Sequence, residues 1–194
     1  MPPTDPFALF AEWMALAQAS EINDPDAMAL ATATPDGRPT VRMVLMRRHG
    51  PNGFGFFTNL DSRKGQEIAA NPWGALCIHW KSLRKQVRAE GRLVQVSDAD
   101  ADDYFASRSR NSQIGSHASD QSRPLDSRDT FVRRVEEAQA RFADGDVPRP
   151  ERWSGFRLVP DRIEFWEDVE FRLHHRRLFE RRDDGSWTEG LLYP

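Results

Sequence analysis

The chain has 194 residues, with 30 Asp and Glu side chains against 27 Lys and Arg, for a formal net charge of −3 at pH 7. This length suits one domain with a hydrophobic core, and the slightly acidic balance argues against general nucleic-acid binding. The chain has one cysteine, Cys77, which excludes an intrachain disulfide and a zinc site built on cysteines. We expect Cys77 to be a small core residue.

The first predicted element is a helix that begins at Asp5-Pro6, because Asp caps a helix and Pro fits its first position. Four residues recur at helical spacing and give it an apolar face: Phe7, Phe10, Met14 and Ala17. We therefore expect residues 1–24 to form a helical segment, acting as a lid or a dimer contact, and residues 25–194 to form one domain.

The start of the chain shows no basic region followed by an apolar core, so we expect no secretory signal. No apolar run approaches the length that a membrane span needs. These two features predict a cytoplasmic protein.

Strand-like runs follow, at residues 28–34, 40–48, 54–58, 73–80 and 86–96. The turns Pro35-Asp36-Gly37 and Gly50-Pro51-Asn52-Gly53 join the first three, which indicates antiparallel hairpins. Hairpins in series are typical of a barrel or a curled sheet.

The second half of the chain predicts helices over residues 98–107 and 126–144. The polar stretch between them, residues 109–124, is expected to be a loop held by a ligand or a solvated connection. Further strands are predicted at residues 153–158, 162–166, 171–179 and 187–193. The absence of a linker-like segment favours a single α+β domain.

The stretch from Thr58 to Glu67 reads as a strand end, a turn and a helix start capped by Asp61 or Ser62. Its first turn carries Arg63 and Lys64, although the free N–H groups there already make a helix start electropositive. Either an anion binds at this point or both long side chains extend into water.

A second basic set lies near the end of the chain. If residues 171–179 form a strand, Arg172, His174 and Arg176 share one face, with Leu173, His175 and Arg177 on the other. Such a face either meets an anionic or electron-rich group or belongs to an exposed strand paired to acids. The candidate acids are Glu164, Glu167 and Glu170.

Two further sets carry donors suited to oxyanions. Tyr104, Arg108 and Ser112 are four residues apart and share one face if their helix continues that far; taken alone, the set equally describes a polar helix face. Arg42 and Arg47 flank an apolar strand, so their side chains either point outward or hold a ligand along it.

Several kinds of site are missing from the sequence. It has no Gly-rich phosphate loop, no histidines at a trusted metal-ligand spacing, no Ser/His/Asp set and no close carboxylate pair. We therefore expect no metal site, and an enzyme of this kind would take its chemistry from a cofactor.

Taken in order, the motifs resemble the pyridoxine/pyridoxamine 5′-phosphate oxidase family over residues 25–194. The motifs that carry the resemblance are Arg42-Met43-Val44-Leu45-Met46-Arg47, Phe57-Thr58-Asn59, Ser62-Arg63-Lys64, Gln86-Val87-Arg88, Tyr104-Phe105, Ser107-Arg108, Ser112-Gln113-Ile114-Gly115, Gln121-Ser122, Glu164-Phe165-Trp166, Arg172-Leu173-His174 and Arg176. Each motif is weak alone, whereas the ordered set is specific.

The resemblance implies a split β-barrel that binds FMN at a homodimer interface. The implied FMN contacts are Arg42, Met43, Val44, Leu45, Met46, Arg47, Phe57, Thr58, Arg63, Lys64 and Gln86, with Gln121, Ser122, Trp166 and Arg176 from the other subunit. Arg63 and Lys64 would hold the FMN phosphate. The substrate phosphate would meet Arg47, Tyr104, Arg108 and Ser112, and Arg172, Leu173 and His174 would bind over the substrate ring, with Arg172 and His174 catalytic.

The implied reaction converts pyridoxamine or pyridoxine 5′-phosphate to pyridoxal 5′-phosphate, with oxygen as electron acceptor and hydrogen peroxide as by-product. Three residues depart from the family pattern: Arg47 stands for lysine, Phe57 for tyrosine and Ser109 for proline. The alternatives are a relative that oxidises another ring, of the phenazine-pathway type, and a carrier of flavin or pyridoxal phosphate without turnover.

Overall fold

The computed structural model describes residues 5–194. Two tight turns connect the strands in the first part of the sheet. Gly37, at φ 84°, lies between β1 (Ala27–Ala33) and β2 (Pro39–Leu45), and Gly53, at φ 108°, begins β4 (Gly53–Asn59) after β3 (Arg48–Gly50). Glycine adopts positive φ without the steric cost of a side chain. The antiparallel hairpins predicted at both turns are confirmed.

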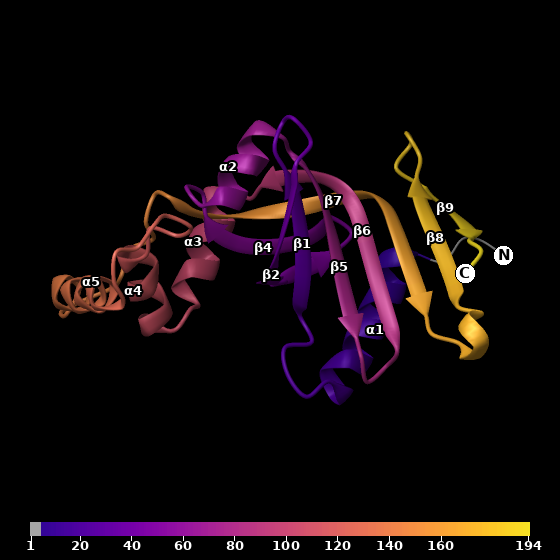
Figure 1. Cartoon of the computed structure of the whole chain (residues 1–194), viewed down its shortest axis with the longest axis horizontal. Helices are drawn as coiled ribbons and strands as arrows, with labels where there is room; N and C mark the ends of the chain where they lie inside the picture. Colours follow the sequence, from indigo (N-terminus) through magenta and orange to yellow (C-terminus); the bar gives the residue numbers. More distant parts are fainter. Residues whose placement is uncertain (1–4) are drawn as a thin grey trace.

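The elements form one curled antiparallel sheet with helices around it (Figure 1). The remaining elements are α1 (Pro6–Ser20), α2 (Arg63–Ala70), β5 (Trp73–Trp80), β6 (Lys85–Gln95), α3 (Asp98–Ala106), α4 (Arg110–Ala118), α5 (Arg128–Arg141), β7 (Trp153–Glu167), the 3₁₀ turn η1 (Glu170–Arg172), β8 (His175–Arg181) and β9 (Trp187–Leu191). The main strand order is β2-β1-β5-β6-β7-β4-β3, with β8 and then β9 joined to β7. This confirms the α+β split-barrel fold class.

Strand β7 joins the parts of the sheet, because it pairs with β6 along its length, with β4 near its start and with β8 near its end. It is continuous, so the two strands predicted at residues 153–158 and 162–166 are one. A register shift at Glu90/Gly91 accommodates Pro160 within the pairing. A Cβ on Gly91 would lie 2.1 Å from the Val159 carbonyl oxygen, so the two backbones approach closely only because residue 91 is glycine.

The main core lies between the sheet and α1, as Figure 1 shows. Asp5 caps α1 as predicted, accepting from Phe7 N at 2.9 Å. Phe10 is fully buried against Phe54 and Trp80, and Trp13 contacts Phe165. The apolar face of α1 is therefore part of the core, and a lid or dimer contact remains a prediction for its exposed face only.

The prediction that residues 109–124 lack regular structure is wrong, because Arg110–Ala118 forms α4. Only Ile114 and Ala118 of this helix are buried, and they lie four residues apart. Its apolar stripe is thus too narrow to stand out in the sequence. Ile114 packs in a second small core with Phe105 and Trp153.

The strand predicted at residues 171–179 is also corrected. Residues 170–172 form η1, and β8 begins only at His175. Phe171 and Arg172 have φ values of 58° and 65°, which strand geometry excludes. The alternation that placed Arg172 and His174 on one strand face is therefore wrong.

Cys77 is half-buried, so the expectation that it belongs to the core is wrong. Its neighbours Leu76 and Ile78 point into the core, which turns Cys77 to the opposite face of β5. Within residues 5–194, no helix is both long and apolar enough to cross a membrane.

Candidate active site

A cleft with a volume of about 910 Å³ opens between β2, β4, the start of α2, and α3 with α4. Its lining residues are Arg42, Met43, Val44, Leu45, Arg47, Phe57, Thr58, Asn59, Lys64, Tyr104, Arg108, Ser109, Ser112, Gly115, Ser116, Ser119, Gln121 and Trp153. A cleft of this size suits a cofactor or another small ligand. Eleven of the predicted cofactor and substrate residues between Arg42 and Ser112 line it, with Gln121 as a twelfth.

Lys64 is the most enclosed cation of the cleft. The side chain of Ser62 caps α2, accepting from Gly65 N at 3.3 Å, and so fixes the first turn that carries Lys64. The Lys64 ammonium is 8% exposed and donates to Thr58 Oγ1 at 2.7 Å and to Gln121 Oε1 at 2.8 Å. Burial, and then the charge of Arg42, lower the pKa of Lys64 to about 8.

All hydrogen-bond partners of Lys64 are neutral, and no carboxylate of the described chain forms an ion pair with it. A buried charge is costly without a partner of opposite sign. The Lys64 environment therefore fits an anionic ligand at the α2 end of the cleft, which is one of the two alternatives that the sequence left open for this helix start.

Arg63 and Arg42 both contact the buried carboxylate of Glu67. Arg63 Nε donates to Glu67 Oε1 at 2.9 Å, and Arg42 Nη2 lies 3.4 Å from Glu67 Oε2. Arg42 is turned inward, since Nη1 also donates to the Leu30 carbonyl at 3.0 Å. Arg63 is 64% exposed and is not one of the residues that line the cleft.

Tyr104, Arg108 and Ser112 do not share one helix, because the chain leaves α3 at Ala106 and begins α4 at Arg110. The fold nevertheless brings all three to the cleft. Arg108 Nη1 donates to Ser116 Oγ at 2.7 Å, and its guanidinium lies 5.0 Å from the Trp153 ring. Burial lowers the pKa of Arg108.

Three aromatic rings form a stacked wall of the cleft. Phe57 lies 4.0 Å from Tyr104 and 5.4 Å from Trp153, measured between ring centroids, and both pairs are nearly parallel. Phe57 thus replaces the family's tyrosine with a ring that packs between two others, and the wall suits a planar ligand. Arg47 lies at the edge of the cleft and pairs with Asp26 at 2.8 Å.

The other predicted residues lie away from this cleft. Gln86, Trp166 and Arg176 are adjacent in the register of β6, β7 and β8. Figure 1 shows β8 and β9 at the opposite end of the molecule from α3 and α4. One protomer therefore divides the predicted site residues into two groups.

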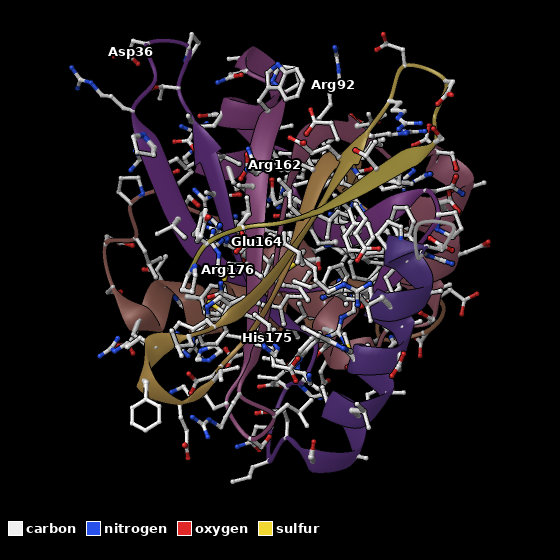
Figure 2. The ribbon with its side chains drawn as sticks, turned by 90° about the vertical axis from the view of Figure 1, so that its right-hand side faces the viewer. Asp36, Arg92, Arg162, Glu164, His175 and Arg176 are labelled. Carbon is white, nitrogen blue, oxygen red and sulfur yellow. The ribbon has the colours of Figure 1, made fainter. Side chains whose placement is uncertain are left out.

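Arg176 is held on β8 by a buried acid. In Figure 2, Glu164 and Arg176 lie side by side on the face formed by the end of the sheet. Arg176 Nε donates to Glu164 Oε1 at 2.8 Å, and Arg88 also pairs with Glu164. Of the two interpretations of the second basic set, pairing with acids thus holds for Arg176. Arg176 Nη1 donates to the Tyr193 carbonyl at 2.8 Å, which ties the C-terminal residues to β8.

The turn before β8 presents the predicted catalytic residues. His174 Nδ1 lies 2.9 Å from Asp168 Oδ1, and its ring lies 4.7 Å from that of Trp166. Arg172 and Leu173 are exposed. The left-handed backbone at Arg172 makes this turn project from the sheet.

Three cofactor-site residues differ from expectation. Gln121 accepts from Lys64 of its own chain and lines the same cleft, whereas its contact with FMN from the other subunit stays a prediction. Met46 is 3% exposed in the core and lies behind the cleft lining. Ser122, at φ 69°, is exposed and does not line the cleft.

Several residues of the cleft were missed in the sequence. They are Asn59, Gly115, Ser116, Ser119 and Trp153, together with Glu67 behind it. The spacing of Glu67 four residues after Arg63 was a readable signal, since such residues are neighbours on a helix. Within residues 5–194, no group of three or more His, Cys, Asp or Glu side chains could hold a metal ion.

The curled antiparallel sheet defines a split-barrel protein, and its cleft combines cations with an aromatic wall that fits an anionic planar ligand. Residues 15–142 match the family described as pyridoxamine 5′-phosphate oxidase, and residues 153–194 match the pyridoxine 5′-phosphate oxidase C-terminal dimerisation region. The chain belongs to the pyridoxamine 5′-phosphate oxidase family, as the motifs predicted.

Similar proteins agree with this family. The chain is 67% identical over 190 residues to a pyridoxine/pyridoxamine 5′-phosphate oxidase of Sphingopyxis alaskensis, covering 98% of this chain and 88% of the relative. It is 61% identical over 197 residues to one of Erythrobacter litoralis, covering 100% and 93%.

Solved structures show the same fold. PhzG from Burkholderia lata 383, in complex with tetrahydrophenazine-1-carboxylic acid, has a TM-score of 0.93 at 33% identity, covering 100% of this chain and 94% of that one. A pyridoxamine 5′-phosphate oxidase-related, FMN-binding protein from Nostoc punctiforme has a TM-score of 0.79 at 19% identity, covering 98% of both chains.

Proposed function

We propose that this protein is an FMN-dependent oxidase that converts pyridoxamine or pyridoxine 5′-phosphate to pyridoxal 5′-phosphate. The observation that carries the proposal is one cleft with two separate groups of polar side chains suited to binding anions. Lys64 and Gln121 lie at the start of α2, whereas Tyr104, Arg108 and Ser112 come from α3 and α4. Two phosphorylated molecules, a cofactor and a substrate, would satisfy both groups.

The residues present fit FMN. Lys64 and Arg63 would bind its phosphate, and the strand from Arg42 to Leu45 would lie along its ring system. When bound, FMN supplies the acceptor for the substrate hydride and passes the electrons to oxygen. The chain's own contribution is to hold both molecules in the reacting orientation and to exclude water.

The substrate phosphate would bind at α3 and α4. Arg108 offers a planar donor fork, which the Trp153 ring and Ser116 hold in place. Ser112, whose hydroxyl lies 2.8 Å from that of Ser109, and Tyr104 add hydroxyl donors. Ser109 thus supports Ser112, although the family's proline would not.

A second subunit would complete the site. We propose a homodimer in which Gln86, Trp166, Arg172, His174 and Arg176 of one protomer face the cleft of its partner. The match of residues 153–194 to a dimerisation region supports this arrangement. So does an apolar strand face on β2, where Val41 is 68% exposed and Met43 64% exposed.

In this dimer, Arg172 and His174 would bind over the substrate ring. Arg172 is exposed and forms no hydrogen bond or ion pair within residues 5–194, although its charge acts on Asp168. It is free to meet the substituent being oxidised, with His174 assisting. The cytoplasmic location stays a prediction.

A second candidate is a flavin oxidase acting on a larger ring. The 0.93 TM-score to the phenazine-binding PhzG favours it. Against it stand Tyr104, Arg108 and Ser112, because three donors on one wall suit a phosphate better than an extended ring system. A carrier without turnover would not need Arg172 and His174.

The test is anaerobic mixing of the FMN-loaded protein with pyridoxamine 5′-phosphate, followed by flavin absorbance. We expect bleaching that recovers when air is admitted, with pyridoxal 5′-phosphate formed. The same trial with pyridoxine 5′-phosphate measures the preference between amine and alcohol. A spectrum that stays oxidised with both substrates would contradict the proposal.

A further inference from the structure

Glu67 is a buried acid placed behind the α2 end of the cleft. Its side chain is 4% exposed, in the second turn of α2 beneath the β1–β2 hairpin. Oε2 accepts from Thr32 Oγ1 at 2.5 Å and from Thr40 Oγ1 at 2.6 Å, and Oε1 accepts from Arg63 Nε at 2.9 Å. Both carboxylate oxygens therefore accept hydrogen bonds from the protein itself.

Glu67 is ionised throughout the neutral range. Burial opposes its ionisation, but the hydrogen bonds from Thr32, Thr40 and Arg63 together outweigh it and hold the pKa of Glu67 at about 2. A carboxylate with so low a pKa neither donates nor takes up a proton near pH 7. Its contribution must come from the cations that it holds.

The two arginines at Glu67 are held differently. The terminal amino groups of Arg42 both donate inward: Nη1 to the Leu30 carbonyl and to Thr32 Oγ1 at 2.7 Å, Nη2 to Thr40 Oγ1. Arg63 is held through Nε alone. Within residues 5–194, its two terminal amino groups form no hydrogen bond or ion pair, and the side chain is 64% exposed.

Holding an arginine through Nε fixes the plane of its guanidinium while leaving the outer edge free. That edge carries two parallel N–H groups, which match two oxygens of a phosphate. A long side chain at a rim would otherwise lose rotamer entropy on binding, and pre-orientation reduces that loss.

We propose that Glu67 is a positioning residue that aims the free edge of Arg63 at the phosphate of the cofactor. This inference rests on the proposed function, since it names how one part of that site is prepared. The direction of the change in FMN affinity on removing the Glu67 charge distinguishes positioning from a purely electrostatic effect. Removing a negative charge beside a phosphate site would strengthen anion binding by Coulomb attraction alone, whereas loss of orientation weakens it.

The experiment compares FMN and riboflavin binding to the metal- and flavin-free full chain, by quenching of flavin fluorescence. Riboflavin lacks the phosphate and reports the rest of the site. We expect Glu67→Gln to weaken FMN binding by about tenfold, because one charged hydrogen bond is lost, and to leave riboflavin binding unchanged. Thr32→Val is the matched control: it removes a donor to Oε2, keeps the Arg63 contact, and should preserve the preference for FMN.

Glu67→Asp provides a second variant should the glutamine variant not fold. It keeps the charge but withdraws the carboxylate by one methylene, so the same selective loss is expected. FMN binding that is unchanged or tighter in these variants, or equal losses for both flavins, would overturn the positioning role. A wild-type protein that binds FMN no better than riboflavin would instead overturn the phosphate assignment in the proposed function itself.

Discussion

The two ends of the molecule are each organised around one buried glutamate that takes two arginines. Glu67 holds Arg42 and Arg63 behind the cleft, and Glu164 holds Arg88 and Arg176 on the strand face of β6, β7 and β8. The chemistry at the two carboxylates is nearly the same. Their surroundings differ, and the difference indicates what each end is for.

At the cleft end, Lys64 adds a third cation without a counter-ion, so this end carries unbalanced positive charge inside a walled site. At the β8 end, Arg172 projects on a turn together with exposed apolar residues such as Leu173, 62% exposed, and Leu191, 82% exposed. These surroundings support the proposal that the first end binds a small anion and the second contacts another protein surface. The predictions below test this division.

The largest effect is expected for Lys64→Met. It removes the buried cation, so FMN binding should weaken on the order of a hundredfold while riboflavin binding changes little. The variant should fold at least as well as the wild type without flavin, because an unpaired buried charge is costly. Flavin fluorescence titration and a thermal melt of the apoprotein measure the two effects. Equal weakening of FMN and riboflavin binding would contradict the assignment of Lys64 to the FMN phosphate.

Arg172→Ala should act on turnover alone. We expect kcat to fall by about a hundredfold, since Arg172 is assigned to the reacting end of the substrate, with the FMN dissociation constant unchanged. Steady-state kinetics and a flavin titration on the same preparation measure both. Full activity would remove Arg172 from the mechanism.

Met43→Glu should weaken the dimer. A carboxylate on the exposed apolar face of β2 would be desolvated at the interface, so we expect dimer dissociation to increase by about tenfold or more. Analytical ultracentrifugation measures it, and activity should fall in parallel. Val132→Glu on α5, where Val132 is 44% exposed, is the matched control and should leave the dimer intact.

Arg108→Lys should raise KM for the phosphorylated substrate by about tenfold with little change in kcat, because lysine keeps the charge but loses the planar fork held by Trp153. The FMN dissociation constant serves as the internal control. A change in FMN affinity equal to that in KM would show that α3 and α4 do not form a separate phosphate site.

A smaller effect is expected from pH. Lys64 has a pKa of about 8 in the free protein, so it loses its charge as the pH rises through 8, and FMN affinity should decrease severalfold between pH 7 and 9. Because the unfolded chain holds this proton up to the ordinary lysine pKa, the same group should make the apoprotein more stable as pH rises above 8. Riboflavin affinity, which does not involve Lys64's charge, should stay flat.

The sequence predicted most elements because their signals are local. Asp5-Pro6, the two hairpin turns and Ser62 each specify a start or a turn within a few residues, and all are confirmed. The errors lie where tertiary contacts decide. The helix α4 buries only Ile114 and Ala118, and nothing in the local sequence specifies the left-handed φ of Arg172.

The same difference between local signals and tertiary contacts applies to the site residues. The resemblance selected residues that line the cleft, such as Lys64 and Arg108, but it could not indicate that Thr32 and Thr40, more than 20 residues earlier, meet Glu67. It assigned Trp166 and Arg176 to the other subunit, but it could not place Gln86 beside them, because that requires the pairing of β6 with β7 at this end of the sheet.

The most direct test of a site shared between subunits mixes two inactive variants. Lys64→Met damages the cleft and Arg172→Ala damages the β8 end, each measured at an FMN concentration that saturates only the wild-type cleft. If a site combines the cleft of one protomer with the turn of its partner, each mixed dimer holds one intact site. After subunit exchange at equal amounts, activity should then return to about a quarter of the wild-type value. A mixture that stays inactive although mixed dimers form would show that each site belongs to one chain, and would contradict the account.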